Sequence, residues 1–252
     1  MRRLNGLLER LAAEAGGFEP AGEPAACDLP GRHHCSGSWH WRDDGGAGSA
    51  YERCPRAVER RRQAAAAHVP GEQTFETFEA LLEPDGFRAA RHWAADCGAG
   101  EARLALLRSG SRPNTGCGKT HLLRAAAREL TRAGRWVELA TAWDLTAAVR
   151  GRALYDAAER AAAEVAAKRW IACEVLLLDD LGQEETAPAP TAGFVIGLLE
   201  GRGARSLAFA TNLTEPELTQ RYGAALVSRL LGGALLPALQ GRDYRRRRQE
   251  QP

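Results

Sequence analysis

The sequence contains no run of about 20 apolar residues, the length that a membrane-spanning helix needs. Its first residues also lack the apolar core of a secretory signal peptide, because Glu9 and Arg10 interrupt the leucines there. No internal repeat is evident, and the formal net charge of +2 at pH 7 indicates no class of partner by itself. These absences predict a cytoplasmic protein with no part in the membrane.

Cysteine pairs of the C-x-x-C type, which are typical of zinc ribbons, are absent although the chain has six cysteines. In a reducing compartment, cysteines are thiols or metal ligands more often than disulfides. We expect Cys97, Cys117 and Cys173 to be small thiols whose role is packing.

Apolar residues, in contrast, are plentiful. They make up 44% of the 252 residues, which is enough for the core of one α/β domain of ordinary size with a small appendage. Short apolar runs predict buried strands over residues 104–107, 136–140 and 175–178. Helical periodicity predicts helices over residues 87–97, 121–132, 143–150 (after a Thr141 cap), 153–171 and 191–200.

The most informative segment is a phosphate-binding loop. It consists of Pro113, Asn114, Thr115, Gly116, Cys117, Gly118, Lys119, Thr120 and His121. The segment follows the pattern G-x-x-x-x-G-K-[ST], except that Pro113 stands in place of the first glycine. In such a loop backbone N–H groups surround phosphate oxygens, the lysine reaches the β- and γ-phosphates, and the hydroxyl (here Thr120) binds Mg²⁺. With a strand before it and a helix after it, the segment predicts binding of a nucleoside triphosphate; the alternative is a glycine-rich surface turn.

A second motif follows the apolar residues 175–178, where the strand ends in Asp179 and Asp180. This is typical of a Walker B strand, because ligands collect at the carboxyl ends of buried parallel strands. Asp179 would hold Mg²⁺, directly or through water, and Asp180 would polarise the attacking water. The two aspartates could instead cap the next helix.

Together these motifs resemble the bacterial helicase-loader ATPases of the DnaC type, which are AAA+ proteins. The matching segments are residues 116–122, residues 179–182, A-T-N-L at residues 210–213, T-F-x-x-F at residues 74–78, S-R-L at residues 228–230 and G-x-D-x-R at residues 241–245. The resemblance covers about residues 70–248, and transposition helper ATPases of the IstB type share most of it. It implies an α/β fold, with an AAA+ P-loop parallel sheet flanked by helices. A small Cys/His-containing region would precede the sheet, and only 23 residues follow Arg229, too few for a full helical lid.

The resemblance also implies roles for single residues. Asn212 becomes a sensor at the end of a strand over residues 206–210, where it hydrogen-bonds the γ-phosphate or the attacking water. Arg229 becomes an arginine finger supplied by a neighbouring subunit. The ATPase module would therefore self-associate. Ala225 stands near a position where the family often has a further arginine. Read without the resemblance, Asn212 would be a turn residue and Arg229 a solvated helix arginine.

The amino-terminal region has a different composition. Four residues, Cys27, Cys35, His40 and Cys54, have the order of the ligands in the N-terminal zinc-binding domains of some helicase loaders. His33 or His34 could replace His40, and the alternative for the whole segment is a disordered Gly/Arg-rich linker. Leucines spaced as in an amphipathic helix occupy residues 1–15, and a basic, alanine-rich helix is predicted near residues 55–68.

These features divide the chain into residues 1–68, a helicase-interaction and candidate zinc-binding region, and residues 69–252, an ATPase domain whose basic tail spans residues 245–248. The resulting hypothesis is an ATP-dependent loader of the replicative DNA helicase that binds single-stranded DNA, hydrolyses ATP with Mg²⁺ and acts in the initiation of replication. The tail is suited to nucleic acid, although a charge run is more often a solvated face. Two alternatives remain: a transposition helper ATPase, and a nucleotide-dependent binding switch with little turnover.

Overall fold

The computed structural model describes residues 39–43, 49–53, 72–81, 83–97, 102–108, 115–152 and 156–239. The elements before the phosphate loop are β1 (Trp39–Asp43), β2 (Ser49–Arg53), α3 (Pro84–Asp96) and β3 (Arg103–Leu106). The loop is followed by α4 (Lys119–Arg132), β4 (Val137–Thr141), α5 (Ala142–Gly151), α6 (Ala157–Ala172) and β5 (Val175–Asp179). The last elements are α7 (Pro188–Arg202), β6 (Ser206–Ala210), α8 (Glu215–Tyr222), α9 (Ala224–Leu231) and β7 (Ala234–Leu235).

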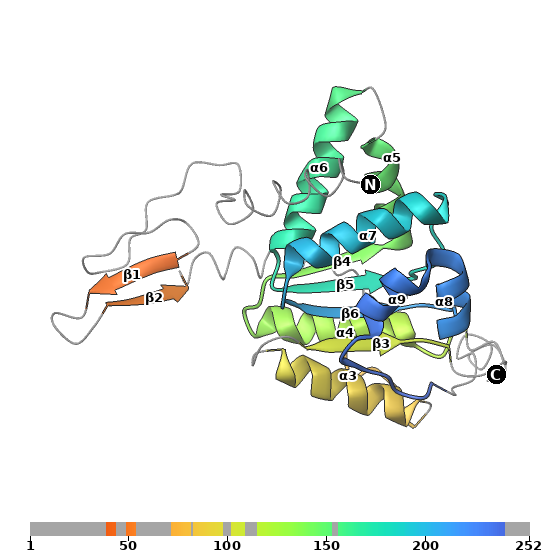
Figure 1. Ribbon diagram of the computed structural model, residues 1–252. Helices are drawn as coiled ribbons and strands as arrows, with labels where there is room; N and C mark the ends of the chain where they lie inside the picture. The colour runs from red at the N-terminus through yellow and green to blue at the C-terminus, as the bar shows by residue number, and fades with distance from the viewer. Residues whose placement is uncertain are drawn as a thin grey trace.

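A five-stranded parallel sheet with the order β4-β5-β6-β3-β7 forms the centre of the domain (Figure 1). Because the strands are parallel, their carboxyl ends lie along one edge of the sheet. β6 lies between β3, which precedes the phosphate loop, and β5, which ends in Asp179. The predicted α/β parallel sheet flanked by helices is confirmed.

Alternating strand residues supply two separate apolar cores, one on each face of the sheet. Leu104, Leu106 and Leu177 pack with α3 and α4, whereas Leu176 and Phe209 pack with helices of the α5–α9 group. All five residues of β5 are buried, as expected for a central parallel strand covered on both faces. Figure 1 shows α4 on one face of the sheet and α7 on the other.

The helix and strand predictions agree with the structure except near the ends of elements. Thr141 caps α5 as predicted, and its side chain and that of Asp144 form a reciprocal capping box. α3 begins earlier than predicted because Pro84 occupies its first turn, where a proline is pre-organised for the helix. Strand β7 was not predicted, since two residues carry no periodic signal.

The antiparallel pair β1–β2 was also not predicted. Its signals were the alternation of Trp39 and Trp41 and the glycine-containing connection before Tyr51. His40 lies in β1, but Cys27, Cys35 and Cys54 lie outside the described residues, as do the predicted helices over 1–15 and 55–68 and the tail at 245–248. Among the described residues, no helix has the length and apolar character needed to cross a membrane.

Candidate nucleotide-binding and hydrolysis site

The phosphate loop enters α4 through glycines in the left-handed conformation. Gly116 has φ of 80° and Gly118, the N-cap of α4, has φ of 96°. No side chain caps this helix, and its first turn has no acidic residue. The first N–H groups of α4 are therefore not capped by a side chain, which is the arrangement of a phosphate-binding site. Pro113 and Asn114 lie outside the described residues, while Thr115 is exposed at the start of the described part of the loop.

The T-F-x-x-F segment packs directly on this loop. A Cβ atom at Gly118 would lie 2.5 Å from Cε2 of Phe78, so the glycine is required by space as well as by its φ. The Phe78 ring also packs edge-on against His121, with centroids 5.2 Å apart, and His121 Nε2 lies 2.8 Å from the Thr74 carbonyl oxygen. Residues 74–78 thus brace the loop and the start of α4.

Lys119 is buried at the first position of α4. Its Nζ donates a hydrogen bond to Sγ of Cys117 over 3.6 Å. Burial raises the pKa of the Cys117 thiol, so the thiol stays neutral near pH 7. A buried cation at the positive end of a helix is well placed to bind phosphate oxygens.

The two predicted magnesium ligands are in contact. Thr120 Oγ1 donates a hydrogen bond to Oδ1 of Asp179 over 3.0 Å. Burial, and then the charge of Asp180, raise the pKa of the Asp179 carboxyl. A divalent cation bound by the Thr120 hydroxyl and the Asp179 carboxylate would compensate the buried negative charge and its repulsion by Asp180, so these residues fit Mg²⁺.

Three strand ends are joined beside these ligands. Leu181 N, just after β5, donates a hydrogen bond to the carbonyl oxygen of Ala210 at the end of β6 over 2.9 Å. Thr211 N, just after β6, donates to the carbonyl oxygen of Leu106 at the end of β3 over 3.0 Å. Asn212, half-buried, follows at the same edge of the sheet. Asp180 has φ of 57°, a left-handed conformation that aspartate adopts more readily than most residues. The order of the strands therefore brings the Asn212 position to the edge where Asp179 and Asp180 lie.

Arg229 lies on α9, and its side chain is 45% exposed. Its Nη2 is 3.3 Å from Oε1 of Glu200, and its Nη1 donates to the Ala225 carbonyl over 3.0 Å. These contacts are with α7 and α9 and not with the phosphate loop. Arg229 is therefore held by contacts within its own chain, while part of its side chain remains exposed.

Sequence reasoning missed Glu184, a fully buried carboxylate in the segment that follows β5. The segment Gln183-Glu184-Glu185 reads as a charged surface loop, and nothing in its pattern marks the middle residue as buried. Among the described residues, Cys97, Cys117 and Cys173 are free and buried, which confirms that they are packing thiols.

Neither a protein-family model nor a curated protein sequence matches this chain. Solved structures do match it in fold. The replication initiator DnaA bound to AMPPCP and single-stranded DNA superposes with a TM-score of 0.53 at 19% identity, covering 68% of this chain and 51% of that one. The DnaC helicase loader superposes with a TM-score of 0.54 at 18% identity, covering 67% of this chain and 97% of that one.

A third similar structure is domain III of DnaA from Thermotoga maritima, with a TM-score of 0.51 at 18% identity, covering 71% of this chain and 72% of that one. The chain spans about half the length of the AMPPCP-bound DnaA structure with single-stranded DNA. At this level of identity the comparison concerns the fold. The chain shares with these proteins a parallel α/β sheet flanked by helices, the fold that the sequence predicted.

Proposed function

We propose that this protein is an ATPase that loads the replicative DNA helicase in the initiation of replication. The observation that carries the ATPase part is the contact of Thr120 with Asp179. That contact joins the phosphate loop to the end of β5, on the edge of the sheet where Asn212 follows β6. The fold shared with the DnaC helicase loader supports the loader part of the proposal.

The residues divide the work of hydrolysis. The loop N–H groups and Lys119 would hold the phosphates, and Thr120 and Asp179 would hold Mg²⁺, which would neutralise phosphate charge when bound. Asp180 orients and polarises the attacking water, and Asn212 hydrogen-bonds that water or the γ-phosphate. Arg229 of a neighbouring subunit completes the site, because the charge spread over the transferred phosphoryl oxygens needs a further cation.

The proposed role of Arg229 predicts complementation between two inactive proteins. We expect Arg229→Ala and Lys119→Ala each to lose ATPase activity, by roughly 10³-fold for the arginine. Mixed together they should regain part of it, because one contributes an intact nucleotide site and the other an intact Arg229. Steady-state ATP turnover of the separate and mixed proteins, with single-stranded DNA present, is the measurement.

Arg205→Ala is the matched control, because Arg205 bonds carbonyl oxygens of Ile171 and Arg202 within its own chain. This variant should retain activity and should not be needed for complementation. If mixed oligomers form, as shown by pull-down of one tagged variant with the other, and no activity returns, Arg229 does not act across an interface.

The loader part predicts a division of labour at residue 69. A fragment spanning residues 69–252 should bind ATP and single-stranded DNA but should not bind the replicative helicase, because the leucine stripe within residues 1–15 and the Cys/His segment have no part in phosphate chemistry. Co-sedimentation of the full chain and the fragment with the helicase is the measurement, and ATP binding by the fragment is its control. Undiminished helicase binding by the fragment would reject this division.

The rival functions differ in partner and in turnover. A transposition helper ATPase would more often lack the Cys/His segment, so zinc bound by Cys27, Cys35, His40 and Cys54 would favour the loader. A nucleotide-dependent switch would bind ATP without appreciable turnover even when single-stranded DNA and helicase are present. The Asp180 conformation favours hydrolysis, since a left-handed residue held at this edge of the sheet is a constrained position of the kind found at active sites.

A further inference from the structure

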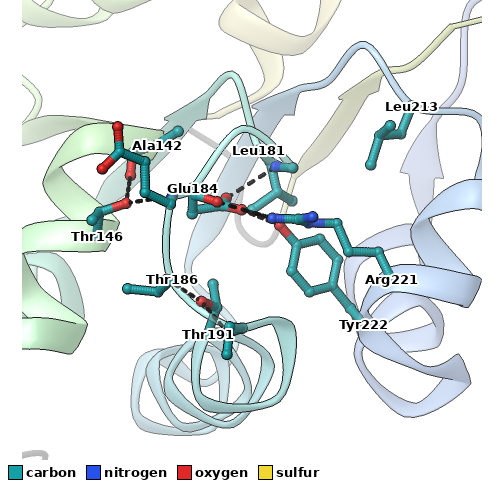
Figure 2. Close-up of polar contacts among 12 residues, drawn as sticks. Ala142, Thr146, Leu181, Glu184, Thr186, Thr191, Leu213, Arg221 and Tyr222 are labelled. Atoms are coloured by element: carbon teal, nitrogen blue, oxygen red, sulfur yellow. Dashed lines mark hydrogen bonds and ion pairs between the residues drawn. The ribbon is translucent and has the colours of Figure 1, made fainter.

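Glu184 is a buried carboxylate that lies beyond the hydrolysis site described above. Its side chain has no exposed surface, and its two oxygens have different partners. Gly182 N donates to Oε1 over 3.0 Å, and the Tyr222 hydroxyl donates to Oε2. Arg221 Nη2 lies 3.6 Å from the same Oε2 and donates to the Glu184 carbonyl oxygen over 3.0 Å. Figure 2 shows Arg221 and Tyr222 converging on Glu184.

A buried charge of this kind has to be compensated, because an unpaired carboxylate in the protein interior is costly. Glu184 meets this requirement only while the end of α8 stays in place. Burial, and then the hydrogen bond to Glu184, raise the pKa of the Tyr222 hydroxyl, which keeps it a proton donor. The cluster is therefore a fixed link between the segment after β5 and the carboxyl end of α8.

One end of this link adjoins the hydrolysis site. Gly182 follows Asp180 by two residues, and a Cβ atom at Gly182 would lie 2.6 Å from Cδ1 of Leu213. The Thr211 hydroxyl donates to the Leu181 carbonyl oxygen. The segment that carries Glu184 is thus packed against the strand end that carries Asn212.

The other end adjoins the helix of Arg229. Arg221 and Tyr222 are the last two residues of α8, and Gly223, with φ of 86°, joins them directly to α9. Leu226 and Leu230 fix the buried face of α9 by apolar packing, which is not directional. The hydrogen bonds to Glu184 are directional and act at the junction where α9 begins, whereas the bond that Arg103 donates to the Arg229 carbonyl oxygen acts further along the helix.

Other contacts hold the same segment to different helices. Glu185 N donates to Oγ1 of Thr146 in α5 over 3.2 Å, and the Thr186 and Thr191 hydroxyls are 2.6 Å apart at the start of α7. These contacts, also drawn in Figure 2, fix the segment independently of α8. Loss of the Glu184 carboxylate should therefore release α8 and α9 rather than the whole segment.

We infer that Glu184 is a positioning residue that, through Tyr222 and Arg221, fixes α9 so that Arg229 is presented correctly to the nucleotide site of a neighbouring subunit. The inference rests on the proposed ATP hydrolysis with an arginine supplied in trans. It differs from a merely structural role in one respect: changing Glu184 should damage the subunit that donates Arg229 and spare the subunit that binds the reacting ATP.

Complementation with the full chain separates these two sides. In the reference mixture, Lys119→Ala donates Arg229 and Arg229→Ala donates the nucleotide site. Adding Glu184→Gln to the Arg229 donor should lower the recovered ATP turnover by about tenfold or more, because small misplacements of a catalytic group have large effects on rate. Adding Glu184→Gln to the site donor should change the recovered turnover less than about threefold, and ATP affinity should be unchanged.

Glu185→Gln is the matched control, because it makes the same chemical change one residue away on a side chain that is 62% exposed. In either position it should leave the recovery unchanged. Tyr222→Phe is the second test variant: it removes one hydroxyl, keeps the ring, and decides the matter if Glu184→Gln fails to fold or to bind ATP. Tyr222→Phe should also lower the recovered ATP turnover when it is placed in the Arg229 donor and not when it is placed in the site donor, by a smaller factor than Glu184→Gln.

Three outcomes would overturn the inference. Normal recovery with Glu184→Gln in the Arg229 donor would show that the cluster does not position Arg229. An equal loss of recovered ATP turnover with Glu184→Gln in the Arg229 donor or in the site donor would show that Glu184 maintains the fold or the nucleotide site of its own subunit instead. No recovery in the reference mixture, despite mixed oligomers, would reject the trans arrangement itself, and the inference with it.

Discussion

Lys119→Ala is expected to abolish measurable ATP binding, an effect on the order of 100-fold or more in Kd, without unfolding the protein. The lysine is the first residue of α4 and is buried beside the phosphate loop, where its charge would meet the phosphates of a bound nucleotide. Lys119 supplies a charge to the phosphates and little to the apolar core, so the nucleotide-free variant should remain folded.

Titration with a fluorescent ATP analogue measures the affinity, and thermal unfolding measures the stability. Lys168→Ala is the matched control, since Lys168 is the only other lysine of the chain and lies on α6, away from the loop. It should bind the analogue with unchanged affinity. Near-original affinity in folded Lys119→Ala would remove Lys119 from the site, and with it the assignment of the phosphate loop.

The sequence predicted those parts of the site in which the local sequence pattern also determines where a residue lies in the folded sheet. The apolar run at residues 175–178 predicted a central strand, because parallel strands covered on both faces are apolar at nearly every position. Asp179 then had to stand at the carboxyl edge, and the phosphate loop had to precede a helix. The Thr120–Asp179 contact follows from these two placements.

The parts that the sequence did not predict depend on contacts between distant segments. Glu184 lies in a segment of charged residues, and it is buried only because α8 brings Arg221 and Tyr222 onto it. The tight packing of Phe78 on Gly118 depends likewise on how residues 72–81 fold back onto α4. Strand β7 exists because β3 offers an unpaired edge beside it, and two residues carry no periodicity from which to predict it.

The second large effect is expected for Asp179→Asn, which should reduce Mg²⁺-dependent ATP hydrolysis by on the order of 100-fold or more, because weaker retention of the metal forfeits several kcal/mol of charge stabilisation in the transition state. An amide oxygen can still accept the hydrogen bonds from Thr120 and from the backbone of Asp180. Packing is therefore preserved, and ATP binding by the loop should persist. Asp180→Asn, in contrast, should lose turnover while the dependence of ATP binding on Mg²⁺ remains.

The same Asp179→Asn substitution should stabilise the nucleotide-free and metal-free protein at pH 7. Burial and Asp180 raise the pKa of Asp179 in the folded chain above its unfolded value. A group with a raised pKa favours folding at pH values below the unfolded pKa, and that contribution is lost as the pH rises through the folded pKa. At pH 7 the ionised carboxylate therefore lowers the free energy of unfolding, and the neutral amide removes this cost. The gain should disappear below about pH 3.9, the ordinary pKa of aspartate, where both side chains are uncharged.

Thermal unfolding of both proteins in EDTA from about pH 3 to about pH 8, a range that spans the ordinary pKa of aspartate, is the measurement, with Asp96→Asn as the control because the Asp96 side chain is 54% exposed. The control should show neither the stabilisation nor the loss of turnover. A gain in stability together with a loss of hydrolysis would mean that Asp179 is kept charged at the expense of stability, which suits a carboxylate whose role is to hold a cation. If Asp179→Asn instead destabilised the metal-free protein while turnover stayed normal, the residue would be a structural cap and the magnesium site would have to lie elsewhere.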